Sequence, residues 1–566
     1  MDEIDVLVVG AGPVGLTAAA ELRRHGVDCR IVDRLAVPQH YAKAVGVQPR
    51  TMEVWDAMGL VGAALNEAVP MHGQLPFVDG RPGPRIELTM PPDIPYGFAA
   101  LPQYTTERLL TEHLAGYGTR VERGTELLAL DQEAEAGTGG ADGPDGRVLA
   151  VLATPSGPRE VRARYVIGCD GAHSLVRKAA GLRFEGDAFP EQYMLGDVEV
   201  DWDLPAGYGV RATHHDAEGR VDDLLVCIPL PGRKRYRVSM LVPDELAGAG
   251  AQDGVAHGLE SGAAPELRHI QAVLDRLSPQ PTHASALRWS STFRISHRLV
   301  DRYRAGRLFL AGDAAHIHPP TGAQGMNTGI QDAYNLAWKL ALAVRGVGAD
   351  GLLDSYHAER HPVGVEVVGR TVRHSRTGVQ ADPGSPDILD AVLRREAQLL
   401  VGYPDSPLVE PEGDGGPAGH GHRPGHGHRP GHGPGSGERA PDSRGLARDL
   451  AHYPVRLFDL LRGPRHTLLF HLDAATPEEP VTTCAVAALS TAHGLLDVYA
   501  VLAPDAPAPL WRLPTARDTG GEFRSAYGAR PGEAFLIRPD GYLAGRFHPP
   551  TPDRLATCLR RTFGTG

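Results

Sequence analysis

The chain opens with a short apolar run, a glycine-rich turn and an amphipathic stretch. Ile4–Val9 is almost wholly apolar, which is typical of a strand buried on both faces of a parallel sheet. Apolar residues then recur at helical spacing from Leu16 to Leu22, and Gly26 marks the end of that helix. A second apolar run follows at Cys29–Val32. This order predicts a β-α-β unit at the start of the chain.

Further strand-like runs divide the rest of the chain. Tyr165–Ile167 and Arg307–Leu310 each lead into a glycine-containing turn. Between them, apolar and polar residues alternate, and Gly/Pro turns separate the alternating stretches, which predicts an antiparallel sheet. Its predicted strands are Tyr193–Val200, Asp223–Ile228 and Tyr236–Val242. Strand-like runs return near the C-terminus at His466–Leu472, Leu496–Leu502 and Ala534–Arg538.

These patterns predict an α/β protein of several domains, as its length of 566 residues suggests. A Rossmann-type dinucleotide-binding domain is expected from residues 1–185 and 287–400, with an antiparallel β-sheet domain inserted at 186–286. Residues 446–566 are expected to form a C-terminal domain. We expect the intervening range 401–445, which contains GHGHRP twice, to be a flexible Gly/Pro/His-rich linker, because such a composition cannot build a packed core.

The turn after the first strand has the GxGxxG pattern at Gly10, Gly12 and Gly15. Such glycines permit a tight turn, close approach of backbone to a diphosphate, and close packing of helix on strand. Asp33, at the end of the second strand, can accept hydrogen bonds from ribose hydroxyls. The same pattern at 346–351 follows a helical stretch and not a strand, so we interpret it as a helix C-cap and loop. The sequence therefore predicts a single dinucleotide site.

Two later turns extend this picture. Gly168–Arg177 follows a predicted strand and contains Asp170-Gly171, and Ala311–His316 follows another and contains Gly312-Asp313. A stretch rich in Gly and Pro, 319–329, then opens a helix. These three segments resemble the GxGxxG, DG and GD fingerprints of the group A FAD-dependent aromatic hydroxylases, the flavoprotein monooxygenases of the p-hydroxybenzoate and phenol hydroxylase type. Among them, the chain is most similar to the hydroxylases that tailor aromatic polyketides.

The resemblance implies a Rossmann-type FAD-binding domain, an inserted antiparallel substrate-binding sheet and a thioredoxin-like C-terminal domain. It also implies that separated segments hold one FAD, through its diphosphate, adenosine ribose, ribityl chain and isoalloxazine ring. The residues expected to bind FAD are Gly10, Gly12, Pro13, Val14, Gly15, Asp33, Arg34, Lys43, Gln103, Asp170, Gly171, Gly312, Asp313, Pro319, Gly325, Met326 and Asn327. Lys43 and His173 stand where the family usually has arginine, which leaves the choice between NADPH and NADH open.

The implied reaction uses NADPH or NADH as a transient co-substrate, together with O2, to hydroxylate a phenolic, polyketide-type small molecule in antibiotic biosynthesis. A flavin C4a-hydroperoxide carries the chemistry, so no side chain is predicted to be catalytic. Reduction of the flavin places negative charge on the N1–C2=O edge of its ring, and a helix beginning near Gly325 would aim amides and a positive dipole end there. Residues predicted to face the substrate are Tyr193, Tyr208, Arg211 and Arg237.

Two alternatives stay open at this point. The same flavin could carry out Baeyer–Villiger oxygenation or epoxidation of a polyketide, because the outcome depends on how the substrate is placed. The chain could also be a non-catalytic flavoprotein partner in a biosynthetic complex. Halogenation is disfavoured, because no two of the five tryptophans have the WxW spacing of flavin-dependent halogenases.

The composition disfavours several classes of binding partner. A net charge of −12 disfavours nucleic acid and anionic membrane surfaces. The five scattered cysteines form no CxxC pair, and no signal peptide or long apolar span is evident, so we expect a cytoplasmic enzyme. His316 and His318 lack a third ligand in the sequence, so no metal site is predicted. Cys484 and Cys558 are isolated, which favours a structural or homodimer-contact role for the C-terminal domain over a redox role.

Overall fold

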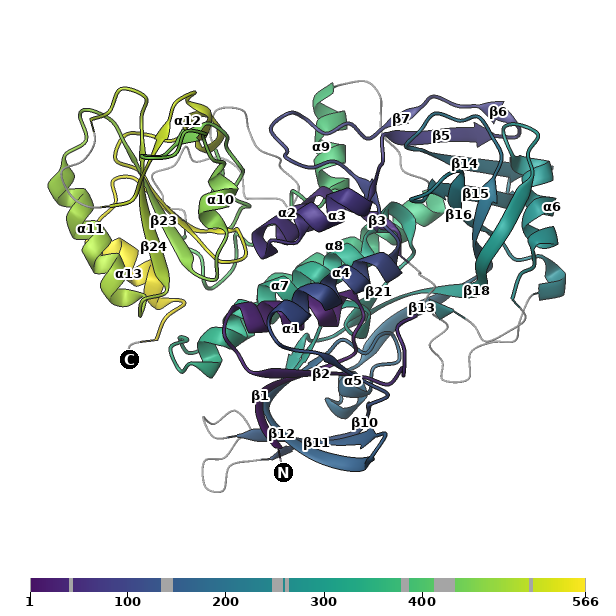
Figure 1. Ribbon diagram of the computed structural model, residues 1–566, viewed down its shortest axis with the longest axis horizontal. Coiled ribbons are helices and arrows are strands. Elements are labelled where there is room, and N and C mark those ends of the chain that lie inside the picture. The colour runs from purple at the N-terminus through teal and green to yellow at the C-terminus, as the bar shows by residue number, and fades with distance from the viewer. Residues whose placement is uncertain are drawn as a thin grey trace.

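The computed structural model describes residues 2–39, 44–133, 146–246, 258–259, 264–377, 386–411, 433–507 and 513–564. The fold is mixed α/β with several sheets (Figure 1). The first sheet has eight strands: β10 (Glu126–Glu133), β11 (Arg147–Thr154), β12 (Gly157–Gly168), β1 (Asp2–Val9), β2 (Cys29–Asp33), β9 (Val121–Arg123), β20 (Leu308–Leu310) and β19 (Arg304–Ala305). Its central pairs, β1 with β12 and β2, and β12 with β20, are parallel.

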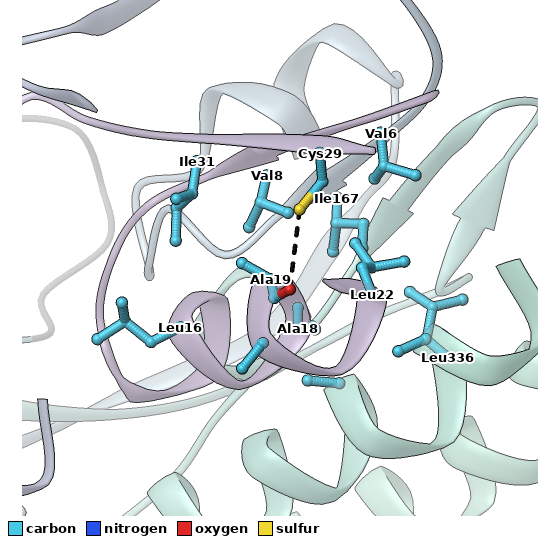
Figure 2. Packing of buried hydrophobic residues seen from close by; sticks show 14 of the residues in the cluster. Val6, Val8, Leu16, Ala18, Ala19, Leu22, Cys29, Ile31, Ile167 and Leu336 are labelled. Atoms are coloured by element: carbon cyan, nitrogen blue, oxygen red, sulfur yellow. Dashed lines mark hydrogen bonds between the residues drawn. The ribbon is translucent and has the colours of Figure 1, made fainter. Parts of the chain in front are cut away.

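Helices cover this sheet because their small and apolar faces fit the buried strands. Helix α1 (Pro13–Arg24) packs against α4 (Gln103–Gly116) and α7 (Gly325–Val344). In Figure 2, side chains of α1 such as Leu16 and Leu22 lie among residues of the strands and Leu336 of α7. The predicted β-α-β unit is thus confirmed. Helix α7 ends at Val344 and Gly346 has a φ of +70°, so the prediction of a helix end and loop at 346–351 is also confirmed.

The second sheet has ten strands. Its main path contains β18 (Ala284–Val300), β13 (Phe184–Val200), β16 (Arg235–Leu241), β15 (Val221–Pro229), β14 (Tyr208–His215) and β5 (Gly73–Val78), with β17 (Gly258–Leu259), β6 (Arg81–Pro82), β7 (Ile86–Glu87) and β21 (His316–Ile317) at its margins. Helix α6 (Leu267–Leu277) packs on one face. The three strands predicted between 186 and 286 are confirmed. The sheet is not purely antiparallel, however, because β14 pairs in parallel with β5, which comes from before the insertion.

The third sheet has six strands, in the order β22 (Leu446–Ala447), β25 (Thr515–Asp518), β24 (Leu496–Leu502), β23 (His466–Leu472), β26 (Ala534–Ile537) and β27 (Leu543–Phe547). The pairs of β24 with β23 and β25 are parallel, and β26 is antiparallel to both β23 and β27. We call residues 433–564 the C-terminal unit. Its helices are α10 (Leu457–Leu461), α11 (Glu478–Thr491), α12 (Glu522–Tyr527) and α13 (Pro552–Arg560).

The expectation of a flexible linker over 401–445 is wrong for both described ends of that range. Tyr403, Leu408 and Val409 are buried, as are Arg439 and Ala440. Backbone hydrogen bonds join Gly437 to Leu543 and Ala440 to Gly541, so this Gly- and Pro-rich segment is held by a distant hairpin. The GHGHRP repeats lie outside the described residues.

A small three-stranded sheet, in the order β3-β8-β4, and several helices complete the described fold. They are β3 (Gly46–Val47), β4 (Val69–Pro70), β8 (Ala99–Ala100), α2 (Pro49–Met58), α3 (Val61–Glu67), α5 (Leu175–Ala179), α8 (Asp354–Thr377), α9 (Pro386–Glu396) and the 3-10 turns η1 (Asp244–Leu246), η2 (Gly312–Ala314) and η3 (Thr321–Ala323). Across the described ranges, no helix combines the length and apolar character needed to span a membrane. No group of three or more His, Cys, Asp or Glu side chains in those ranges could hold a metal ion.

Candidate flavin site

The three glycine-containing turns meet at one edge of the first sheet. Val9 is in register with Gly168, and Gly168 with Leu310, so β1, β12 and β20 end side by side. The amide of Cys169 donates to the carbonyl of Val9, and that of Ala311 donates to the carbonyl of Gly168. The carboxyl ends of neighbouring parallel strands are where open α/β sheets bind ligands. The structure therefore brings the three sequence motifs together.

The glycines of the first turn divide into two kinds. A Cβ on Gly10 would lie 2.3 Å from the carbonyl oxygen of Cys169, and one on Gly15 would lie 1.9 Å from that of Gly10. Both are therefore required by protein packing. No described atom lies within 4 Å of a Cβ placed on Gly12, the N-cap of α1, and no side chain caps that helix. Gly12 thus leaves open space in front of a helix start, which suits a phosphate.

Asp33 links this turn to the end of β2. Its Oδ2 accepts a 2.7 Å hydrogen bond from the amide of Ala11, and its Oδ1 accepts one of 2.9 Å from Leu35. The guanidinium of Arg123 lies 3.6 Å from Oδ1. The carboxylate is half-buried beside the glycine turn, where a ribose could reach it. The neighbouring Arg34 is exposed, and Lys43 lies outside the described residues.

The carboxylate of Asp170 is engaged within the protein. It accepts from the hydroxyl of Ser174 at 2.6 Å and from the amides of Leu175 and Val176 at 2.7 and 3.2 Å, at the start of α5. Burial raises the pKa of Asp170, and these hydrogen bonds oppose that rise. Asp170 therefore shapes the DG turn, while Gly171, with φ +81° and open space at its Cβ position, can let a ligand approach.

A buried arginine that the predicted site omitted joins the second and third turns. Arg177 donates to the carbonyls of Ala172 and Ala314, at 2.8 and 3.1 Å, and its guanidinium lies 4.0 Å from the centre of the Phe184 ring. Its two carbonyl partners belong to the DG turn and the GD turn, respectively. The sequence signal was an arginine seven residues after Asp170, but its partner at Ala314 depends on the fold.

The GD turn packs against the start of α1. Gly312 has a φ of +61°, and a Cβ there would lie 2.9 Å from Val14, so only glycine fits. Its amide donates to Asp332 of α7 at 3.1 Å. Asp313 follows in the same 3-10 turn and is half-buried. The turn thus places a carboxylate beside the glycine loop, where it could accept from ribityl hydroxyls.

Helix α7 begins next to this turn with no side-chain cap and no acidic residue in its first turn. The side chain of Asn327 is buried and points to neighbouring backbone, accepting from Gln48 and donating to Gly46 and Ala323. It therefore holds β3 against α7, and its side-chain polar atoms are engaged within the protein. An uncapped helix start of this kind stabilises negative charge.

The remaining predicted FAD contacts lie on the border of the site. Gln103 accepts from the amide of Ala44 at 3.1 Å and donates to Glu107 at 2.8 Å, so it orders the chain immediately after Lys43. Pro319 is buried, and its carbonyl lies 2.9 Å from Nδ1 of His318. Met326 is half-buried and packs against the first core.

The second sheet turns a mixed polar and aromatic face away from α6, and we call this face the roof. Residues directly opposite each other on paired strands share a face. Asp197 is opposite both Arg237 and Trp289, and Tyr193 is opposite Phe293. Arg211, Val226, Ser239 and Leu195 form the next row. The roof therefore carries three of the four predicted substrate residues.

These polar roof residues are not equivalent. The buried Arg237 pairs with Asp197, and its guanidinium lies 4.9 Å from the centre of the Trp289 ring. Arg211 is half-buried, and no carboxylate within the described ranges pairs with it. Burial raises the pKa of Tyr193, and the charge of Arg211 opposes that rise. Tyr208 lies apart: it belongs to the other face, with its hydroxyl 2.8 Å from Glu87.

The donor set fits FAD. Two uncapped helix starts, at Gly12 and Gly325, suit a diphosphate and an anionic ring edge, and two half-buried carboxylates, Asp33 and Asp313, suit the ribose and the ribityl hydroxyls. All four lie around one sheet edge. The geometry can therefore hold one extended dinucleotide.

Comparison with known proteins is consistent with this geometry. The protein family described as "FAD binding domain" matches residues 3–371. The chain is 34% identical to the 6-methylpretetramide 4-monooxygenase of Streptomyces rimosus over 576 residues, which cover 96% of this chain and 91% of that protein. It is 31% identical to the pentachlorophenol 4-monooxygenase of Sphingobium chlorophenolicum, with 96% and 93% covered. The solved structure of CabE, an aromatic hydroxylase from angucycline biosynthesis, superposes with a TM-score of 0.70 at 30% identity over 99% of both chains.

Proposed function

This chain belongs to the FAD-binding-domain family and is an FAD-dependent aromatic monooxygenase, and from that premise we propose that it uses NAD(P)H and O2 to hydroxylate a phenolic, polyketide-type molecule in antibiotic biosynthesis. The observation that carries the proposal is the convergence of three turns on one sheet edge, with the α7 start beside them. The names of two relatives add support, because one is a 6-methylpretetramide 4-monooxygenase and the other a pentachlorophenol 4-monooxygenase.

Each part of the protein has a role in this proposal. Gly12 and the start of α1 would bind the diphosphate, Asp33 the ribose and Asp313 the ribityl chain. The backbone amides at the start of α7 would stabilise negative charge on the isoalloxazine ring. When bound, FAD supplies the redox chemistry, namely oxidation of NAD(P)H and activation of O2. The protein contributes binding, orientation and exclusion of water.

The roof provides the substrate contacts. Trp289, Phe293 and Tyr193 offer flat apolar surface for a fused-ring ligand. Asp197 neutralises and orients Arg237. This ion pair would suit the hydroxyl and carbonyl groups of a substrate. The guanidinium of Arg211 would stabilise a ring hydroxyl as its phenolate, which is the form that reacts with an electrophilic oxygen.

Isotope labelling tests the reaction. Addition of a polycyclic phenol should accelerate NADPH oxidation by the purified protein, and the product should gain one oxygen atom from 18O2. The same mixture under nitrogen is the control. Incorporation from labelled water, or oxygen inserted beside a ketone and not on the ring, would contradict aromatic hydroxylation.

Replacing Arg211 with methionine tests the assignment of the roof. We expect the KM for the phenol to rise about tenfold or more, because a hydrogen bond to a charged group contributes roughly 1.5–3 kcal/mol, while FAD content stays unchanged. Arg220→Met, on the exposed turn between β14 and β15, is the matched control. Equal KM values for the two variants would remove Arg211 from the substrate site.

A further inference from the structure

A buried network of charges joins the C-terminal unit to helices α7 and α8. Arg538 lies in the hairpin between β26 and β27 and donates to both oxygens of Glu359 of α8, at 2.6 and 2.9 Å. Asp540 of the same hairpin accepts from Arg538 and from Trp338 and Asn335 of α7. The side chains of Arg538 and Glu359 are 0% exposed, so this ion pair is shielded from solvent.

A second line of contacts runs from the same hairpin to the GD turn. The Tyr542 ring lies 4.5 Å from that of Tyr403, whose hydroxyl accepts a 2.9 Å hydrogen bond from Arg360. Arg360 also donates to Asp332 at 2.7 Å and to the carbonyl of Thr328, in the first turns of α7, at 3.1 Å. Asp332 in turn accepts from the amide of Gly312 at 3.1 Å.

Asp332 is the point where this line reaches the flavin site. Besides Gly312 and Arg360, its carboxylate lies 2.8 Å from Nε2 of His316, at the far end of the GD turn. Burial would raise the pKa of Asp332, but Arg360 and His316 outweigh it and hold that pKa below its usual range. One ionised carboxylate therefore fixes both ends of the turn that carries Asp313 to the body of α7.

Buried charges are an energetically costly way to attach the C-terminal unit to α7 and α8. Two surfaces can be joined by apolar packing at least as stably as by buried ion pairs, which lose hydration and gain only when every group is paired. What a satisfied polar network adds is a single allowed arrangement, because any shift leaves charges unpaired. Here the arrangement that it selects is the position of the GD turn relative to the start of α7.

We propose that the C-terminal hairpin is a positioning element of the flavin site, acting through Tyr403, Arg360 and Asp332 on Gly312. The C-terminal unit thereby sets how firmly FAD is held, although none of its residues is assigned to FAD contact. This inference rests on the proposed assignment of the flavin site.

The rate of FAD dissociation from the full-length protein tests this proposal. Tyr403→Phe removes only the hydroxyl that accepts from Arg360. FAD should dissociate from this variant about fivefold faster, because the lost hydrogen bond to a charged group reaches the flavin site only indirectly and so only part of its free energy affects FAD binding. Tyr542→Leu should change the rate in the same direction and should add little when combined with Tyr403→Phe, because both act on one line of contacts. The visible circular dichroism of bound FAD should change in the same variants.

Tyr527→Phe is the matched control. Tyr527 is also buried, and its hydroxyl donates to the carbonyl of Pro441 within the C-terminal unit, away from the line to Asp332. We expect this variant to lower thermal stability but to release FAD at the wild-type rate. Wild-type release from Tyr403→Phe, or equal acceleration in both variants, would overturn the positioning role while leaving the flavin site intact. A wild-type protein that takes up no FAD would overturn both.

Discussion

Gly12→Val is expected to weaken FAD binding at least about 100-fold while the apoprotein keeps its thermal stability. The φ of Gly12 is −75°, which any residue adopts, and no described atom lies within 4 Å of the Cβ position. The fold therefore accommodates the side chain. It would project into the space in front of the α1 start, where a diphosphate has to lie to reach the amides. Gly10 cannot serve this test, because a Cβ there would collide with the backbone of Cys169.

Titration of the apoprotein with FAD, followed by flavin fluorescence, measures this effect. Gly463→Val is the control, because Gly463 also has open space at its Cβ position and lies in the C-terminal unit. That variant should bind FAD as the wild type does. Wild-type affinity in Gly12→Val would show that the diphosphate does not lie at this helix start.

Asp313→Ala should raise the dissociation constant for FAD about 10- to 150-fold. The buried ribityl hydroxyls would lose a charged acceptor worth roughly 1.5–3 kcal/mol. The dissociation constant of Asp313→Asn should lie between those of the wild type and Asp313→Ala, because asparagine keeps an acceptor oxygen but not the charge. Asp350→Ala, in the exposed loop after α7, is the control. Undiminished flavin content in Asp313→Ala would exclude Asp313 from the site.

The ligand-facing turns could be predicted from the sequence, because each is defined by residues that are close together in the chain. A strand, a glycine turn and a helix occur together within a few residues, so the turns at Gly10, Gly168 and Gly312 could be predicted as ligand-facing. Their convergence on one site was expected only from the resemblance to the aromatic hydroxylases, and it arises because β1, β12 and β20 are parallel neighbours that end at the same edge. The role of each side chain was less predictable. Asn327 points to β3 and Asp170 caps α5, because both bind backbone that is fixed only by the fold.

Composition misled where packing depends on distant partners. Residues 433–445 are rich in Gly and Pro, which indicated a linker, yet Gly437 and Ala440 are hydrogen-bonded to the hairpin at 541–543. The partner is about a hundred residues away, so no local pattern could reveal it. The parallel pairing of β5 with β14 in the second sheet was missed for the same reason, because the two strands are far apart in the sequence. Arg360 and Asp332 read as ordinary helix charges until the fold places them together.

Flavin stoichiometry tests the central claim most directly. The claim is that three separated turns, together with the start of α7, form one FAD site. Apoprotein prepared from the full chain and titrated with FAD should saturate at one equivalent per chain, and the bound flavin should bleach with NADPH and recover its colour in air. Failure to take up FAD, or saturation at two equivalents, would contradict the account.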